Sequence, residues 1–304
     1  MSWVFLTQAF VFKLKKPVRQ PYLDFSTCAM REAACREELR INQRLSAGVY
    51  LRLARITRIA GDGFELDGTG SVEDWLVVMR RLDDRLMLDK RLAEGASLSS
   101  AIEKLADVLA SFYLSAPSDF LIPEAYVERF RKQFRLDRSV IAQSHFRIDH
   151  ARAKAILDLL DQRLEAFEPL LRERVASGCI IEGHGDLRPE HVWLGDRIRV
   201  IARLEFNRDL RMVDPFDELA FLGMECAAVG ANWIGPLLIR SASAQLQSPA
   251  STDLIHFYHA SRATLRARLS LAHLFDEKPR DPAKWEPQAE RYLDQAGVGL
   301  SLPR

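Results

Sequence analysis

The sequence predicts an α+β fold, with a small β-rich lobe at residues 1–82 and a larger, mostly helical lobe at residues 83–304. Two observations carry this prediction. Up to about residue 82, short apolar runs rich in Val, Phe and Leu alternate with turn residues, which is typical of antiparallel strands and hairpins. From residue 83 onward, apolar residues recur at helical spacing over longer segments.

Composition and charge narrow the class of protein. The chain has 304 residues, of which 48% are hydrophobic, and 43 Lys and Arg against 42 Asp and Glu give a net charge of +1. A core of normal size is therefore expected, and no overall field would attract nucleic acid or a membrane surface. The four cysteines show neither a C-x-x-C pair nor zinc spacing, so buried reduced thiols in a cytoplasmic protein are expected.

The β-rich lobe begins with a predicted hairpin. Two short apolar runs, residues 2–6 and 9–14, flank a polar pair, and Pro17 ends the second strand because it has no N–H to donate. A helix is expected over residues 29–45, with Ser26 or Thr27 as its N-cap. Further strands are predicted at residues 49–59, 64–66 and 74–79.

The second lobe reads as a series of helices. They are predicted at residues 89–94, 98–114, 124–143, 149–174, 215–229, 254–274 and 288–296. Residues 219–239 are the most apolar long stretch, and because Glu225 and Asn232 interrupt them, one buried helix is favoured over a membrane span. Arginines recur on the helices at 124–143 and 254–274. They form either a solvated face or a positive face for an anionic substrate or an acidic partner.

The most informative stretch is GHGDLRPEHVWL at residues 183–194. It is a polar hairpin between apolar runs, so it is expected to be a loop held between two buried strands. Loops of this kind often carry catalytic groups, because their roots are rigid and their tips are exposed. Asp186 is therefore a candidate catalytic residue. The alternative is a carboxylate that only bonds to nearby amides, and for His184 a brace of the loop is favoured.

His184-Gly185-Asp186, followed five residues later by His191, resembles the catalytic loop of the protein-kinase-like phosphotransferases. Gly185 and Leu187 make it similar to the aminoglycoside phosphotransferase and choline kinase branch. The longer pattern, with LEFNRDLRMVDPFDELAFL, is similar to a subfamily in which some members are fused to a P-loop domain. The resemblance implies a two-lobed protein-kinase-like fold, the cofactors ATP and Mg²⁺, and a small-molecule hydroxyl as acceptor. Asp186 would be the base.

The resemblance also assigns nucleotide-binding residues in the first lobe. Lys13 would hold the α and β phosphates, and Glu38 would pair with it, with Glu37 as the alternative. The backbone of the linker would face the adenine edge at Met79, Arg80, Arg81 and Leu82. The alternatives without a function in binding are that Lys13 is a solvated lysine at a strand end and that Glu38 is a solvent-facing glutamate. The glycine-rich loop that precedes the hairpin in such proteins is not in this sequence, so a shortened first lobe is expected.

Both metal positions depart from the pattern. The place of the Mg²⁺-binding Asp is taken by Ala202, whose methyl group cannot bind a hard cation. His191 stands where Asn is usual, and imidazole suits transition metals better than Mg²⁺. The candidate metal ligands are His191 and Glu205, the latter only if the chain turns after Ala202, with Asp209 as a weaker choice.

Three functions stay open at this point. The first is an ATP-dependent phosphotransferase, impaired or not by Ala202. The second is a pseudokinase that binds nucleotide without catalysing transfer. The third is an interaction protein that binds an acidic protein partner through the arginine-rich helices. In the segment Asp214-Pro215-Phe216-Asp217, the two carboxylates are expected to cap a helix and brace the loop.

Overall fold

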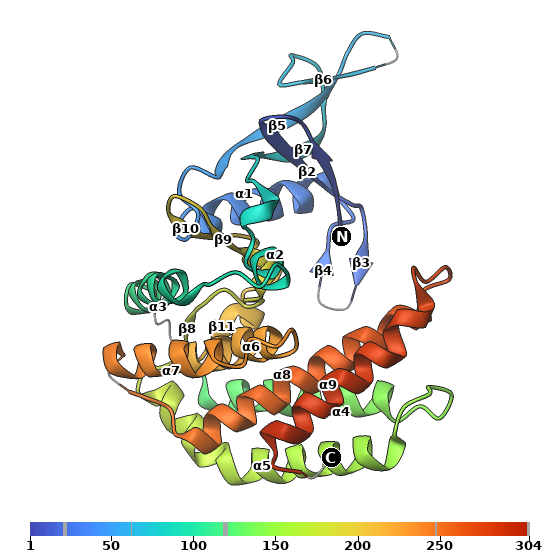
Figure 1. Cartoon of the computed structure of the whole chain (residues 1–304). Helices are drawn as coiled ribbons and strands as arrows, with labels where there is room; N and C mark the ends of the chain where they lie inside the picture. Colours follow the sequence, from blue (N-terminus) through green and yellow to red (C-terminus); the bar gives the residue numbers. More distant parts are fainter. Residues whose placement is uncertain (21–22, 62, 118–120, 247, 303–304) are drawn as a thin grey trace. The chain divides into compact units, whose positions relative to one another are not determined.

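The computed structural model describes residues 1–20, 23–61, 63–117, 121–246 and 248–302. The chain divides into two compact units, whose elements are labelled in Figure 1. The sheet unit comprises residues 1–112 and 184–212, and the helical unit comprises residues 113–183 and 213–304. Residues 184–212, which follow a long helix in the sequence, thus group with the N-terminal sheet.

The main sheet of the sheet unit is antiparallel, with the strand order β1-β2-β7-β5-β6 in the described part of the chain. Its strands are β1 (Ser2–Leu6), β2 (Phe10–Lys15), β5 (Tyr50–Arg58), β6 (Phe64–Leu66) and β7 (Val72–Arg80). The predicted hairpin is present, with Phe5 opposite Phe12. The other predicted strands also form, because their alternating apolar residues can face a core.

Helix α1 (Cys28–Asn42) packs against β5 and β7. The Thr27 hydroxyl caps it by accepting a hydrogen bond from the Met30 N–H at 3.2 Å. Cys35 on this helix packs in a core with Val77. Glu38 follows Cys35 by three residues and so lies on the same, buried face of the helix.

Shorter elements complete the sheet unit. They are β3 (Arg19–Gln20), β4 (Leu23–Asp24), α2 (Leu88–Ala93), β9 (Val192–Leu194), β10 (Ile198–Val200) and most of α3 (Ser99–Leu114). Strands β9 and β10 pair antiparallel. In the sequence, β8 (Ile181–Glu182) and β11 (Met212–Val213) stand at the two ends of the segment that joins the sheet unit. The loop with Asp186 therefore lies between two short strands, β8 and β9.

The helical unit consists mainly of long helices. They are α4 (Pro123–Ile141), α5 (His150–Ala176), α6 (Pro215–Ala227), α7 (Ile234–Gln245), α8 (Thr252–Ala272) and α9 (Trp285–Gly299). Helices α8 and α9 pack along each other, and so do α4 and α5 (Figure 1). Aromatic side chains fill the core between α4 and α8, where the rings of Phe130 and Phe257 have centroids 5.6 Å apart. These elements confirm the predicted α+β class.

The helix predicted at residues 215–229 is present as α6, but the apolar stretch 219–239 does not form a single buried helix. Two helices cover this stretch, because α6 ends at Ala227. Gly230 has a φ of +88°, a conformation that glycine adopts without strain, and it ends the helix together with the hydrogen bond from Ala231 N–H to Cys226 O at 3.0 Å. In the described ranges, no helix has the length and apolar character needed to cross a membrane.

Candidate active site

His184 braces the loop that carries Asp186. Its Nε2–H donates to the carbonyl of Ile201 at 2.8 Å, and its Nδ1 accepts from the N–H of Asp186 at 3.2 Å. This pattern requires the neutral ring with its proton on Nε2. Burial lowers the pKa of His184 to about 3, so the ring stays neutral at physiological pH.

His191 fixes the loop from the other side. Its Nδ1–H donates to the carbonyl of Asp186 at 2.7 Å, and its ring stacks on that of His184 with centroids 5.5 Å apart. Burial is the main cause that lowers its pKa, and it outweighs the nearby Asp186 carboxylate. The neutral ring therefore keeps a lone pair on Nε2, 3.5 Å from the Arg188 guanidinium.

Asp186 presents a partly exposed carboxylate on this braced loop. Its side chain is 32% exposed, and one oxygen lies 3.1 Å from Arg188 Nε. The preceding Gly185 has a φ of +88°, and a Cβ there would come within 3.1 Å of the Leu204 side chain. Only glycine fits this position without strain. The backbone around Asp186 is thus fixed while its carboxylate can reach a ligand, as a general base requires.

The segment after β10 is held by every one of its first four amides. The N–H of Ile201 donates to His191 O at 2.9 Å, and the N–H of Ala202 donates to the Tyr50 hydroxyl at 2.9 Å. The N–H of Arg203 donates to Asn42 Oδ1 at 2.9 Å, and the N–H of Leu204 donates to His184 O at 3.1 Å. Strand β10 ends at Val200, and Ala202 has a φ of +62°, in the left-handed region. The chain therefore turns at Ala202. This turn is required for Glu205 to be a candidate metal ligand.

Two lysines and two glutamates meet where β2, α1 and this segment come together. Lys13 Nζ lies 2.6 Å from Glu38 Oε1, and Lys15 Nζ lies 2.5 Å from Glu38 Oε2. Lys15 also forms an ion pair with Glu205. The structure thus brings the predicted residues Lys13 and Glu38 into contact. Glu37, the alternative, instead pairs with Arg211.

The charges in this cluster stabilise one another. Burial would raise the pKa of Glu38, but the ammonium groups of Lys13 and Lys15 outweigh it and hold the pKa below its ordinary value. Burial would likewise lower the pKa of Lys13, and Glu38 followed by Glu205 raises it instead. Both groups are therefore charged over the physiological pH range.

Sequence reasoning missed Lys15 as a member of the site. A signal was available, because residues i and i+2 of a strand share a face, and Lys13 and Lys15 in FVFKLK are spaced in this way. Lys16, on the other face, instead lies over the ring of Trp3 at 5.4 Å. The contact between Lys15 and Glu205 joins residues 190 positions apart, which no local pattern indicates.

The predicted adenine-facing segment lies at the end of β7. Met79 and Arg80 belong to this strand, and the N–H of Arg80 donates to Val49 O at 2.8 Å. The N–H of Arg81 donates to Ala9 O at 2.9 Å. These two amides already serve the sheet, so an adenine contact would have to use carbonyl groups of the segment or the backbone of Leu82. The role of this segment stays a prediction.

The side chains at the predicted metal positions do not fit Mg²⁺. Residue 202 offers a methyl group, His191 offers nitrogen to a cation that prefers oxygen, and the carboxylate of Glu205 is paired with a buried ammonium. Within the described ranges, no three His, Cys, Asp or Glu side chains are grouped to hold a metal ion. That His191 and Glu205 bind a metal ion therefore stays a prediction, which the chemistry of these side chains does not favour.

In the helical unit, Asp214 and Asp217 make structural contacts. Asp214 caps α6 by accepting from Phe216 N–H at 2.9 Å, and it also pairs with Arg174. Asp217 pairs with Arg262 at 2.6 Å. The arginine-rich helices are also paired: Arg131 with Glu168, Arg138 with Asp161, Arg266 with Glu225 and Arg268 with Asp137. Much of the positive charge on these helices is thus neutralised locally.

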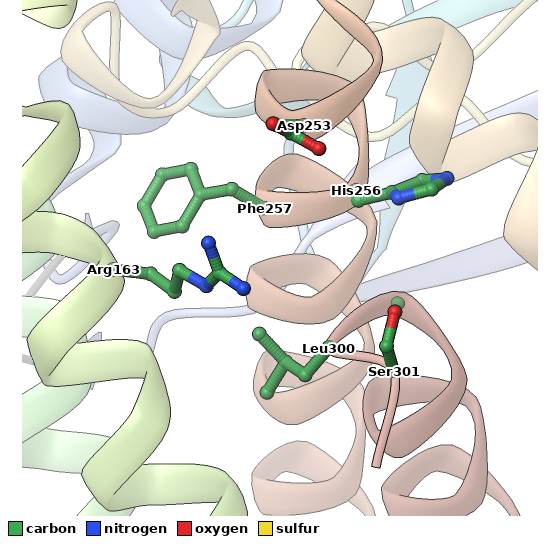
Figure 2. A pocket seen from close by; sticks show the side chains of 7 residues that line it. Arg163, Asp253, His256, Phe257, Leu300 and Ser301 are labelled. Carbon is green, nitrogen blue, oxygen red and sulfur yellow. The ribbon is translucent and has the colours of Figure 1, made fainter.

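A small pocket also occurs in the helical unit, where Arg163 reaches from α5 toward α8 (Figure 2). The residues around it are Arg163, Asp253, His256, Phe257, Gly299, Leu300 and Ser301. Because no predicted site residue lines it, this pocket is not the candidate active site.

Comparison with known sequences finds relatives of unknown activity. The chain is 30% identical to an uncharacterised protein of Mycobacterium tuberculosis and equally to one of Mycobacterium bovis, over 96% of its own length. It spans only 58% of the length of these relatives. No protein family profile matches the sequence. These relatives give no activity that could be transferred.

Solved structures are more informative about the fold. A choline kinase from Streptococcus pneumoniae matches with a TM-score of 0.56 at 14% identity, covering 99% of this chain and 89% of the other. A choline/ethanolamine kinase family protein from Mesorhizobium loti gives 0.55 at 15% identity, with 99% and 86% covered. The GDP complex of aminoglycoside 2'-phosphotransferase-IIIa gives 0.52 at 15%, with 98% and 89% covered. The chain therefore has the two-lobed, protein-kinase-like fold of the choline kinases and aminoglycoside phosphotransferases.

Proposed function

We propose that this protein binds a nucleotide, with ATP as the expected ligand, through the cluster around Lys13, and that it transfers phosphate weakly or not at all. The observation that carries the proposal is the ion pair between Lys13 and Glu38 at 2.6 Å, beside a metal position occupied by Ala202. The Lys13 side chain is 22% exposed, so its ammonium can reach a phosphate while Glu38 holds it in place. That the solved aminoglycoside phosphotransferase binds GDP supports a nucleotide ligand.

A second candidate is an active phosphotransferase that acts on the hydroxyl of a small molecule. The braced loop favours it, because His184 and His191 fix the backbone of Asp186 and leave its carboxylate partly exposed. A carboxylate in this place can accept the proton of an acceptor hydroxyl. Without a fitting Mg²⁺ site, however, the charge that develops on the phosphates is poorly neutralised, so slow transfer is expected.

Calorimetric titration with ATP tests the nucleotide binding that both candidates require. Lys13→Met should weaken ATP binding at least tenfold, because the partly exposed lysine of the cluster is lost. Lys16→Met, which removes the same charge from the other face of the segment, is the matched control and should leave the affinity within twofold. ATP binding that is absent, or that is indifferent to Lys13, would contradict the nucleotide-binding proposal.

The catalytic candidate is tested separately with Asp186→Asn. This variant should bind ATP as the unmodified protein does, because the proposed base contacts the acceptor hydroxyl and is not one of the residues proposed to hold the nucleotide. Any transfer of the γ-phosphate of radiolabelled ATP to a panel of amino alcohols and aminoglycosides should fall by two to four orders of magnitude. Transfer that survives Asp186→Asn would show that another group acts as the base.

A further inference from the structure

Lys15 is an unusual side chain, because its ammonium is completely enclosed between two carboxylates. Its side chain has 0% exposure, and Nζ contacts Glu38 at 2.5 Å and pairs with Glu205. The ring of Phe25 lies 5.3 Å from the same atom. A buried ammonium is tolerated only when it is paired and hydrogen-bonded, so these carboxylates hold Lys15 in place.

The cluster is neutral as it stands. Lys13 and Lys15 contribute two positive charges, and Glu38 and Glu205 contribute two negative ones, so their sum is zero. The net charge of the cluster therefore does not attract a divalent cation, and a cation near Glu205 would be repelled by the ammonium paired with the same carboxylate. The carboxylate that could have served as a metal ligand is already neutralised from within the chain.

Residue 202, whose backbone lies next to this cluster, adds no charge to it. The Ala202 N–H donates to the Tyr50 hydroxyl at 2.9 Å, and Tyr50 is buried beside the cluster. Its pKa is raised, first by burial and then by the negative charge of Glu38. Residue 202 is thus held close to the charged groups but adds no charge of its own. An Asp at this place would leave the cluster with an unbalanced negative charge, as a bound metal requires.

We propose that the Lys15 ammonium takes the place of a divalent cation at Glu205, so that this protein binds nucleoside polyphosphates in their metal-free form. The proposal rests on the nucleotide binding proposed above. In this arrangement Lys13 contacts the phosphates, and Lys15 is a positioning residue that acts through Glu205. Mg²⁺ should then have no part in holding the nucleotide.

Calorimetry with ATP in EDTA and with ATP in excess Mg²⁺ tests this directly. For the unmodified protein, the two affinities should agree within twofold. Lys15→Met removes the internal cation and exposes the charge of Glu205, so Mg²⁺ should now raise ATP affinity at least fivefold. Lys15→Met/Glu205→Gln is the matched control, and Mg²⁺ should have no effect on it. Tenfold tighter binding with Mg²⁺ in the unmodified protein, abolished by Glu205→Gln, would show Glu205 to be a metal ligand and overturn the proposal.

A titration with Mn²⁺ alone, followed by electron paramagnetic resonance, separates this proposal from the proposed function. Lys15→Met should bind Mn²⁺, whereas the unmodified protein and the double variant should not. This result would support the role of Lys15 even if ATP did not bind. If Lys15→Met bound no Mn²⁺ and showed no Mg²⁺ effect, the proposal would be wrong. Should Lys15→Met fail to fold, the unmodified protein compared with Glu205→Gln decides. Equal affinities in EDTA and in Mg²⁺ for both proteins support the proposal, and an Mg²⁺ effect in the unmodified protein that Glu205→Gln abolishes overturns it.

Discussion

Ala202 combines a residue without polar atoms with a backbone conformation that suits Asn, Asp or Gly better. Its φ of +62° brings Cβ close to the following carbonyl oxygen, which strains residues with a side chain. The four consecutive amide hydrogen bonds of residues 201–204 keep it there. The surrounding contacts thus impose the backbone conformation of Ala202, and its methyl side chain does not stabilise that conformation.

Replacing Ala202 by Gly should therefore stabilise the protein. Glycine removes the steric strain, and its greater freedom in the unfolded chain offsets part of the gain, so the free energy of unfolding should rise by about 0.5–1 kcal/mol. Ala202→Val should lower it, since a branched side chain fits this region worst. Urea denaturation of both variants measures these changes. Equal stability of the two would show that the turn at residue 202 is not strained.

His184 makes the stability of the protein depend on pH. Its pKa in the folded state is about 3, against about 6.5 when unfolded, because burial disfavours the charged ring. Between these values the unfolded chain binds a proton that the folded chain does not. Stability is therefore fully present above pH 6.5 and falls as the pH drops toward 3, by at most about 1.4 kcal/mol per unit.

His184→Gln provides the measurement, because an amide can still donate to Ile201 and does not titrate. The free energy of unfolding, determined between pH 4 and pH 7, should fall less steeply in this variant than in the unmodified protein. His256→Gln is a control, since it removes a histidine from α8 in the helical unit. If all three proteins had the same slope, His184 would not be the group that titrates.

At the scale of the elements, α6 and α7 approach each other through two glycines. A Cβ on Gly223 would come within 2.7 Å of Gly235 Cα, which belongs to the neighbouring helix backbone. Backbone cannot move aside as a side chain can. Close approach therefore depends on glycine at both positions, and this explains why a helix interior here tolerates a residue of low helix propensity.

Gly223→Ala should destabilise the protein by about 1–3 kcal/mol, because the added methyl group forces the two helices apart. Gly297→Ala in α9 is the matched control, since the atoms nearest to its Cβ belong to the end of the Arg152 side chain, which can shift more easily than backbone. That variant should be destabilised less than Gly223→Ala. Thermal and chemical denaturation of both variants test the pair, and equal effects would contradict the close helix contact.

At the scale of the whole molecule, an apolar edge strand coincides with a small net charge. Strand β1 is at one edge of the main sheet, and its residues from Trp3 to Leu6 are largely exposed. Exposed apolar edges can pair with other chains. The isoelectric point is about 7.7, so charge repulsion between molecules is weakest near physiological pH.

Solubility is accordingly expected to be lowest near pH 7.7 and to improve in Phe5→Lys. Phe5 is 52% exposed on β1, and a charge there opposes edge pairing. Leu114→Lys adds the same charge at a residue that is 58% exposed but lies on a helix, so it should help less. Light scattering against protein concentration compares them. Equal gains would indicate that net charge, and not the edge strand, limits solubility.

The sequence by itself determined the class of the fold and most of its elements, because these follow from local periodicity and from capping and turn residues. It also singled out the Asp186 loop and the contact of Lys13 with Glu38, whose roles in phosphate transfer stay predictions. It failed at residues 219–239, where the left-handed glycine at position 230 divides one apolar stretch into two helices.

Only the tertiary structure decided which residues of the site contact one another. It placed Lys15 between Glu38 and Glu205, turned the chain at Ala202, and bound residues 202 and 203 to Tyr50 and Asn42. The contacts of Lys15 with Glu205, of residue 202 with Tyr50 and of residue 203 with Asn42 join segments more than 150 residues apart in the sequence. Their geometry depends on how strand, helix and loop pack together, and periodicity over a few residues carries no information about such packing.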